Sequence, residues 1–327
     1  SRPVEEDIDR FRFMNGRDQL KKRGYKVIFT PNVFRKADHF GRSSSGKEKA
    51  RQFGSLVKNP RVKAIYSASG GDFLAEMLPF TDIDEFRENP KWVQGYSDNT
   101  SLLYYLTTKA DVATAYGANF SDFGMEKWDL SVGRGLEILE GKCSVQKSFS
   151  FYQDGFGFRE TGLEGYRRDA PVKWQCVTSD SDSCAFQGRL LGGCMDVLLN
   201  LAGTRYDGTC EFVEKYKDDG IIWYLESFDL HFEQMMEGLW KMKELGWFEH
   251  VAGFIFGRPL FYASPEMDMS EEHPYEEVLL ERLSCFNVPI ITGADIGHKG
   301  PQFVMINGAK AAVKCENGRG SVEYIVG

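Results

Sequence analysis

Two stretches, VKAIYSASGG (residues 62–71) and WVQGYSDNT (residues 92–100), carry the strongest signal of the fold. Each is a short apolar run that ends in small and polar residues, and helical patterns follow. Strands that alternate with helices indicate a mostly parallel sheet, whose ligands bind at the carboxyl ends of the strands. Ser67–Gly71 and Gly95–Asn99 are therefore the first places to look for a binding site.

The same alternation extends in both directions from these stretches. We predict helices over residues 5–23, 46–58, 99–109, 229–246 and 274–286. We predict strands over residues 26–29, 62–69, 92–97, 113–117, 221–227, 251–257 and 289–297. Residues 302–326 resemble paired strands with a turn at residues 316–318. The fold class is therefore α/β.

Residues 119–187 break this rhythm, since they are rich in Gly, Ser, Asp and aromatic residues. We predict an N-terminal α/β domain with a parallel sheet over residues 1–140. A linker with an irregular excursion follows over residues 141–187. A smaller C-terminal α/β domain with terminal β-strands completes the chain over residues 188–327.

Composition excludes several classes of function. The chain has 327 residues and a formal net charge of −8 without a basic cluster, which argues against nucleic acid and anionic membranes as partners. No apolar run approaches the ~18 residues of a membrane span, and the charged N-terminus lacks a signal-peptide core, so we expect a cytoplasmic protein. The seven cysteines form no C-x-x-C pair, so we expect free buried thiols and no metal site.

Ser97 lies in the turn GYSDNT between a predicted strand and a predicted helix. A serine on such a turn is held out of the sheet, and the amide of Asp98 with the helix N-terminus can stabilise an oxyanion. Gly95 leaves room for the tight approach, although Asn99 stands where the general pattern has a second glycine. Two interpretations stay open on this evidence: Ser97 is a nucleophile, or it caps the helix.

A serine nucleophile needs a base, and the base needs an orienting acid. His298, in GADIGHKGP, is the best placed of five histidines, because it follows a strand end. Glu226 ends the apolar strand IIWYL, where a buried carboxylate needs a partner such as a histidine N–H; helix capping is the alternative. Gly70 and Gly71 either bring backbone N–H groups close to a ligand or form a tight turn.

These motifs occur together in one known family. Residues 63–106 resemble the LD-carboxypeptidase and microcin C immunity peptidases in a GG turn, a leucine-proline-aspartate segment, N-P-K and G-[YF]-S-D-x-T. GRLLGGCMDVLLNLAGT (188–204), WYLESFD (223–229) and GADIGHKGPQFVMINGAKAAV (293–313) resemble its later motifs. The similarity spans roughly residues 15–325.

The resemblance implies a serine carboxypeptidase that acts on C-terminal residues, needs no metal or other cofactor, and forms a homodimer. Its site lies between two α/β domains. The roles carried over are Ser97 as nucleophile, His298 as general base, Glu226 as the residue that orients it, and the backbone N–H groups of Gly71 and Asp98 as the oxyanion hole.

The long excursion carries Trp174 in a polar, acidic setting, KWQCVTSDSDS. This resembles the microcin C immunity branch, in which a loop aromatic helps hold the nucleotide part of an aminoacyl-sulfamoyl adenosine. We therefore expect Trp174 and Gly70 to contact a small peptide or peptidyl-nucleotide substrate, although Trp174 could equally fill a core or interface. Cys194 departs from the family, where asparagine is commoner, and the family's first strand has no counterpart in this numbering.

Three alternatives stay open. A murein tetrapeptide LD-carboxypeptidase of cell-wall recycling has the same chemistry and a shorter connection between its domains. An ordinary α/β-hydrolase has its serine, acid and histidine on one sheet. A non-catalytic small-molecule-binding module would use the Gly70–Gly71 turn and leave the Ser97 hydroxyl far from every imidazole.

Overall fold

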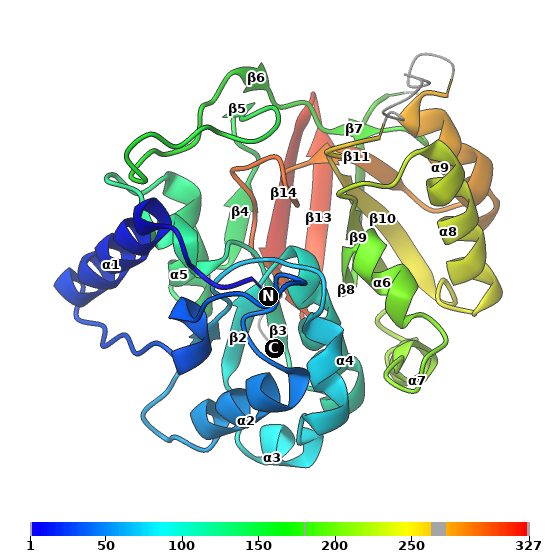
Figure 1. Cartoon of the computed structure of the whole chain (residues 1–327). Coiled ribbons are helices and arrows are strands. Elements are labelled where there is room, and N and C mark those ends of the chain that lie inside the picture. Colours follow the sequence, from blue (N-terminus) through cyan, green and yellow to red (C-terminus); the bar gives the residue numbers. More distant parts are fainter. Residues whose placement is uncertain (1, 180, 263–272, 326–327) are drawn as a thin grey trace.

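The computed structural model describes residues 2–179, 181–262 and 273–325, and its main strands form two separate sheets (Figure 1). The small sheet has the order β1-β2-β3-β12; β1 to β3 are parallel and β12 is antiparallel to β3. Its strands are β1 (Ala64–Tyr66), β2 (Trp92–Gly95), β3 (Thr114–Tyr116) and β12 (Met305–Asn307). The helices of this half are α1 (Asp7–Lys22), α2 (Gly46–Val57), α3 (Ile83–Glu88), α4 (Thr100–Ala110) and α5 (Leu130–Leu139).

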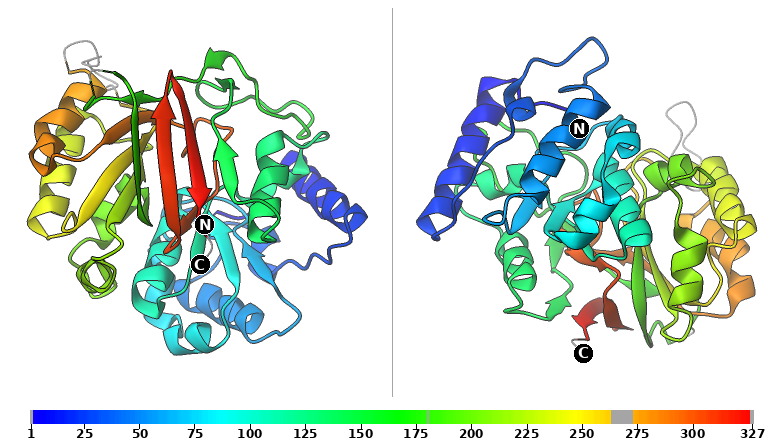
Figure 2. Two further views of the ribbon diagram at one scale, coloured as in Figure 1. Left: turned by 180° about the vertical axis from the view of Figure 1, so that it is seen from behind. Right: turned by 90° about the horizontal axis from the view of Figure 1, so that it is seen from below.

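The large sheet has the order β4-β14-β13-β8-β9-β10-β11-β7, in which β8 to β11 are parallel. Its strands are β4 (Val145–Lys147), β7 (Gln175–Cys176), β8 (Cys184–Cys194), β9 (Ile221–Glu226), β10 (Val251–Gly257), β11 (Ile290–Ala294), β13 (Lys310–Glu316) and β14 (Arg319–Tyr324). Its helices are α6 (Met195–Leu201), α7 (Thr209–Lys215), α8 (Phe232–Glu244) and α9 (Tyr275–Leu283). Figure 2 shows the two halves side by side. The α/β fold class is thus confirmed.

Helix α4 joins the two halves, because it packs against β2 and β3 on one side and against β8, α6 and α7 on the other. Nine of its eleven residues are buried, so the helix is enclosed around most of its circumference, as expected for a helix inside a core. Because α4 is packed on both sides, the position of its first turn is fixed. This turn directly follows Ser97–Asn99.

One secondary-structure prediction is wrong. Residues 26–29 are extended but belong to none of the sheets in the described part of the chain; Val27 and Phe29 instead pack against a cluster around Phe13 and Phe120. Side-chain packing alone produces the alternation that suggested a strand there. The predicted pairing of the terminal strands is confirmed, since β13 and β14 pair antiparallel from Glu316 and Arg319 outward, while β12 pairs with β3 of the small sheet.

The excursion contributes β4 and β7 to opposite edges of the large sheet, and β5 (Phe151–Tyr152) pairs with β6 (Ala170–Pro171). The division at residues 140 and 187 stays a prediction. All seven cysteines are free, and Cys210 and Cys285 are exposed rather than buried. Among the described residues, no helix is both long and apolar enough to cross a membrane.

Candidate active site

Ser97 has a φ of +64°, which a residue with a side chain rarely adopts. It follows β2 by two residues and begins the single turn Ser97–Asn99 that leads into α4. A Cβ on Gly95 would lie 2.9 Å from side-chain atoms of Asn99 and of Ser67, so only glycine fits there. The turn is therefore tight and strained, as in nucleophile elbows.

Asn99, which interrupts the general elbow pattern, holds this turn together. Its Nδ2 donates to the carbonyl oxygens of Tyr96 at 2.8 Å and of Ser69 at 3.2 Å, and its Oδ1 accepts from Ser67 Oγ at 2.6 Å. The carboxylate of Asp98 accepts the N–H of Leu74 at 3.1 Å. The ends of β1 and β2 are thus tied together by side chains.

Gly70 and Gly71 lie beside the elbow. A Cβ on Gly70 would lie 3.3 Å from Ser97 Oγ, so the glycine leaves the hydroxyl accessible from that side. Gly71 has a φ of +152°, which also favours glycine. The two glycines, Ser97 and Asp98 are therefore brought together at one edge of the small sheet.

Glu226 and His298 form a buried ion pair at the carboxyl edge of the large sheet. Glu226 ends β9, and its Oε2 lies 2.8 Å from His298 Nδ1; the two side chains are 0% and 4% exposed. Burial opposes the charged form of both groups, but the attraction between them prevails. The pKa of Glu226 is therefore lowered and that of His298 raised. This leaves a carboxylate that orients the imidazole and favours its protonated form.

Tyr116, at the end of β3, connects the two sheets. Its hydroxyl donates to Glu226 Oε1 and accepts the N–H of Ser97 at 3.1 Å. The ring of Tyr96 lies 5.1 Å from the ring of His298, centroid to centroid. Within the described residues Ser97 Oγ makes no hydrogen bond to His298, and in unliganded enzymes such bonds are often long.

Sequence reasoning missed Tyr116, although it ends the predicted strand 113–117 and so falls at the same sheet edge as Ser97. Ser97 follows a strand of the small sheet, whereas Glu226 ends a strand of the large sheet and His298 follows another strand of the large sheet. This arrangement differs from that of an ordinary α/β-hydrolase, which has all three on one sheet.

Cys194 ends β8 directly opposite Glu226 in the parallel register. Its Sγ lies 3.4 Å from Asp196 Oδ2, and burial, followed by the charge of Glu226, raises the pKa of its thiol well above the usual value. It is therefore a buried, protonated neighbour of the ion pair.

The position of Trp174 corrects the prediction that this residue contacts the substrate. Its side chain is fully buried, its Nε1 donates to Asp295 Oδ2 at 3.0 Å, and its ring lies against Gly320 and Phe303. Asp295 also accepts from Arg258, whose guanidinium donates to the carbonyl of Lys299 at 3.0 Å. Trp174 therefore has no free face for a substrate, and it supports the loop that carries His298.

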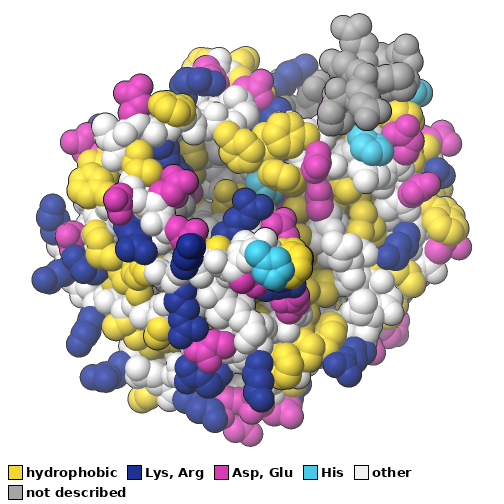
Figure 3. Space-filling model, in the orientation of Figure 1, with side chains coloured by type: hydrophobic (Ala, Val, Ile, Leu, Met, Phe, Trp, Pro, Cys, Tyr) yellow, Lys and Arg dark blue, Asp and Glu magenta, His cyan; other side chains and the backbone are white. Residues whose placement is uncertain are grey.

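Aromatic side chains extend from His298 to the protein surface instead. The ring of Phe228 lies 4.9 Å from His298 and 5.6 Å from Phe261, and both phenylalanines lie 6.2 Å from Phe156. Phe156 is 62% and Phe261 45% exposed. We call these three the aromatic rim. Figure 3 shows hydrophobic side chains gathered beside a hollow on this face.

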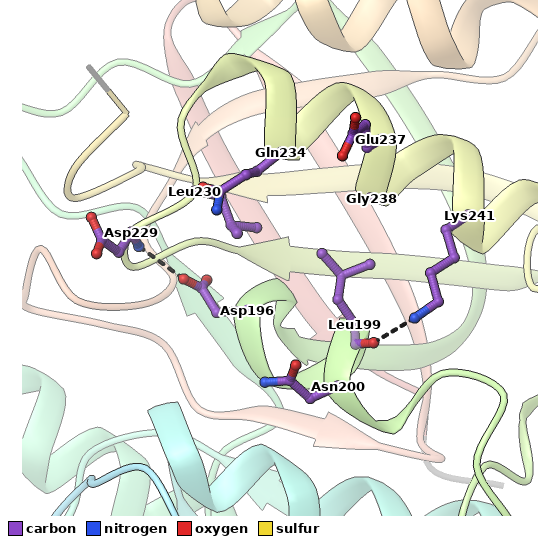
Figure 4. Close-up of a pocket in the computed structure, with 9 residues that line it drawn as sticks. All are labelled: Asp196, Leu199, Asn200, Asp229, Leu230, Gln234, Glu237, Gly238 and Lys241. Carbon is purple, nitrogen blue, oxygen red and sulfur yellow. Dashed lines mark hydrogen bonds between the residues drawn. The ribbon is translucent and has the colours of Figure 1, made fainter. Parts of the chain in front are cut away.

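A cavity of about 480 Å³ lies between α6, α8 and the segment after β9 (Figure 4). Asp196, Asp229 and Glu237 line it together with Lys241, which donates to the carbonyl of Leu199 at 2.8 Å. Asp196 also accepts the N–H groups of Phe228 and Asp229 at 2.9 Å, so the cavity adjoins the segment that carries the aromatic rim. Three of its four charged lining residues are acidic.

In the described ranges, no group of three or more His, Cys, Asp or Glu side chains is arranged to hold a metal ion. What the site offers is a strained serine, a buried carboxylate–imidazole pair and glycine-rich backbone. These are the groups of covalent acyl transfer.

Comparison with known proteins agrees with this chemistry. Residues 1–117 match the LD-carboxypeptidase N-terminal domain, and residues 187–313 match the LD-carboxypeptidase C-terminal domain. The Escherichia coli microcin C7 self-immunity protein MccF is 28% identical over 319 residues, covering 94% of this chain and 86% of the relative.

A solved structure and a second relative extend this comparison. A solved structure of a MccF mutant with adenosine monophosphate is 25% identical, with a TM-score of 0.77 over 96% of this chain and 91% of its own. A probable murein peptide carboxypeptidase of Bacillus subtilis is 23% identical over 266 residues, or 81% of this chain and 73% of the relative.

Proposed function

Since this chain belongs to the LD-carboxypeptidase family of serine-type carboxypeptidases, we propose that Ser97, His298 and Glu226 form its catalytic triad. The observation that carries the proposal is the hydrogen-bonded set that joins the Ser97 elbow to the buried Glu226–His298 pair through one tyrosine hydroxyl. A serine that merely capped α4 would need neither a positive φ nor this link to an ion pair.

In the proposed reaction, Ser97 Oγ attacks the carbonyl carbon of the scissile amide while His298 Nε2 takes the hydroxyl proton. His298 then gives that proton to the leaving amine, which releases the C-terminal product and leaves an acyl ester on Ser97. Water, deprotonated by His298, hydrolyses the ester. Glu226 keeps the Nε2 atom of the neutral imidazole unprotonated and stabilises the imidazolium.

We propose the N–H groups of Gly71 and Asp98 as the oxyanion hole. The positive φ of Gly71 and the contact distance between Gly70 and Ser97 support this assignment, because they bring the glycine backbone within reach of the reacting carbonyl. Asp98 follows the nucleophile directly, which is the usual source of one of the two donors.

For the substrate we propose a peptidyl or aminoacyl-sulfamoyl adenosine, as in microcin C immunity. Similarity to a MccF structure that holds adenosine monophosphate supports this class. The aromatic rim supports it independently, since the exposed rings of Phe156 and Phe261, next to Phe228 and through it to His298, offer a stacking surface for a purine base. Here the rim replaces Trp174 as the candidate base-binding surface.

A murein tetrapeptide is the second candidate. The cavity supports it, because carboxylates of Asp196, Asp229 and Glu237 would attract an amino group of a peptide. The Bacillus subtilis relative belongs to this functional class by its name.

A direct comparison of the two substrates tests the proposal. The purified chain is incubated with aspartyl-sulfamoyl adenosine and, separately, with a murein tetrapeptide, and products are measured by mass spectrometry. We expect faster hydrolysis of the nucleotide, no hydrolysis by Ser97→Ala, and normal hydrolysis by the control Ser55→Ala. Unchanged turnover by Ser97→Ala would rule out the proposed triad, and preference for the tetrapeptide would reassign the substrate.

A further inference from the structure

We propose that Tyr116 is a positioning residue, whose hydroxyl couples the nucleophile elbow of the small sheet to the carboxylate of the triad on the large sheet. This inference rests on the proposed function of Ser97, Glu226 and His298. It adds a fourth side chain to the catalytic apparatus, one that touches neither substrate nor reacting atoms.

The ring of Tyr116 is held from several sides. Its strand lies between β2 and β12, with Gly95 and Met305 as its register partners, and its side chain is fully buried. The rings of Tyr224 and Tyr96 lie 5.9 and 6.5 Å away, centroid to centroid. The hydroxyl therefore has a fixed position between the two halves.

The hydroxyl uses both its donor and its acceptor capacity. It donates its proton to Glu226 Oε1 and accepts the N–H of Ser97. Burial, and after it the charge of Glu226, raises the pKa of Tyr116 well above the usual value, so the hydroxyl stays protonated and remains a donor. A phenylalanine would leave a buried N–H and one oxygen of a buried carboxylate without this partner.

Two consequences follow for catalysis. The bond to Ser97 fixes the backbone of a residue whose φ of +64° is unfavourable by itself, so it steadies the direction of Oγ. The bond to Glu226 lowers the basicity of the carboxylate and, through it, sets how strongly Glu226 holds the proton on His298.

Within the described residues, the other groups that interact electrostatically with the Glu226–His298 pair are Tyr96 before the elbow, Cys194 on β8, Asp196 on α6 and Tyr275 on α9. All of them are unchanged in a Tyr116→Phe variant. A change in the pH dependence of that variant would therefore report the missing hydroxyl.

The test compares Tyr116→Phe with Tyr104→Phe. Tyr104 is also fully buried, and its hydroxyl also bridges the two halves, to Thr209 Oγ1 at 2.6 Å, but away from the triad. Both variants lose one buried hydroxyl and serve as matched probes of stability.

For Tyr116→Phe we expect kcat to fall about tenfold to a hundredfold with little change in KM, somewhat less than the loss of an oxyanion donor. The acid limb of kcat/KM should move to higher pH, because a more basic Glu226 holds the His298 proton more tightly. Tyr104→Phe should change neither quantity. Identical kinetics and pH profiles for the two variants would overturn the inference.

A second measurement covers the case in which Tyr116→Phe does not fold. Replacing Tyr116 by 3-fluorotyrosine keeps the ring and hydroxyl but makes the hydroxyl a stronger donor, so the acid limb should move to lower pH. An unmoved limb contradicts the inference. If the wild-type chain hydrolyses substrate but Ser97→Ala does so equally well, the proposed function fails first, whatever the tyrosine variants do.

Discussion

The two sheets hold their parts of the site by different means. The small sheet presents Ser97 on a strained turn that Gly95 permits and Asn99 ties to neighbouring strands. The large sheet holds Glu226 and His298 by burial and mutual charge. The proposed nucleophile thus depends on backbone geometry, whereas the proposed acid–base pair depends on electrostatics. Substitutions on the two sides should therefore fail differently.

The largest effect should come from neutralising the charged side. Glu226→Gln should lower kcat by roughly 10⁴-fold with the fold intact, because an amide stabilises the wrong imidazole tautomer. The control is Glu214→Gln, which removes an exposed glutamate paired with His250 at 3.3 Å and should leave kcat unchanged. Equal rates for wild type and Glu226→Gln would remove Glu226 from the triad.

The same pair predicts a pH dependence. The proposed base works when it is neutral. Attraction to Glu226 overcomes the effect of burial and raises the pKa of His298 above the ordinary histidine value of about 6.5. Activity should therefore begin to decline at a higher pH than it would with an ordinary histidine. The raised pKa of His298 stabilises the folded chain at pH values below the pKa of this histidine in the unfolded state. This stabilisation is lost as the pH rises through its pKa in the folded state. Urea unfolding of wild type and a His298→Gln variant should therefore differ less at high pH; a constant difference would contradict the sign.

On the geometric side, Gly95→Ala should destabilise the chain by about 1–3 kcal/mol and lower activity, because the new Cβ meets Asn99 and Ser67 at 2.9 Å. Gly54→Ala in α2 is the control, since a Cβ at that position would have no neighbour within 4 Å and the change should be neutral or slightly stabilising. Chemical denaturation measures both. Equal stability of the two variants would show that the elbow is not tight.

Replacing Trp174 distinguishes a structural role of this residue from a role in substrate binding. Trp174→Phe should cost about 1–3 kcal/mol of stability, because Asp295 loses a buried donor, and KM should stay unchanged. Trp240→Phe, at an exposed position, should change neither quantity. A raised KM without lost stability would instead indicate that Trp174 binds substrate.

The smallest change in stability should be a gain. Ser97→Gly removes the side chain from a residue with φ of +64° and should stabilise the fold by about 1 kcal/mol while abolishing hydrolysis. A thermal unfolding scan measures this. Lower stability of the glycine variant would mean that the turn carries no strain.

Sequence patterns predicted the edge residues well, because Ser97, Glu226 and His298 each follow an apolar strand, and strand ends meet at one edge of a sheet. Such patterns could not predict the contacts between the two sheets. Tyr116 acts on Glu226, 110 residues later, and the sequence around neither residue indicates the other. Asn99 interrupts the elbow pattern in the sequence, and the hydrogen bonds of its side chain become evident only in the fold.

The wrong predictions have the same origin. Polar neighbours made Trp174 resemble a loop residue, whereas it is buried beside the edge strand β7, against Gly320 of β14 and Phe303. Residues 26–29 have a strand-like alternation because one face packs against aromatic side chains, although no described strand pairs with them.

The central claim is that a serine of one sheet and a histidine of the other act as one catalytic pair. Treatment with a fluorophosphonate, followed by peptide mass spectrometry, tests it directly, since an activated serine displaces fluoride and keeps the phosphonyl group. We predict a single adduct on Ser97 in the wild type, and labelling slowed by at least about 10³-fold in His298→Gln. An adduct on another residue, or equally fast labelling of Ser97 in His298→Gln, would contradict the claim.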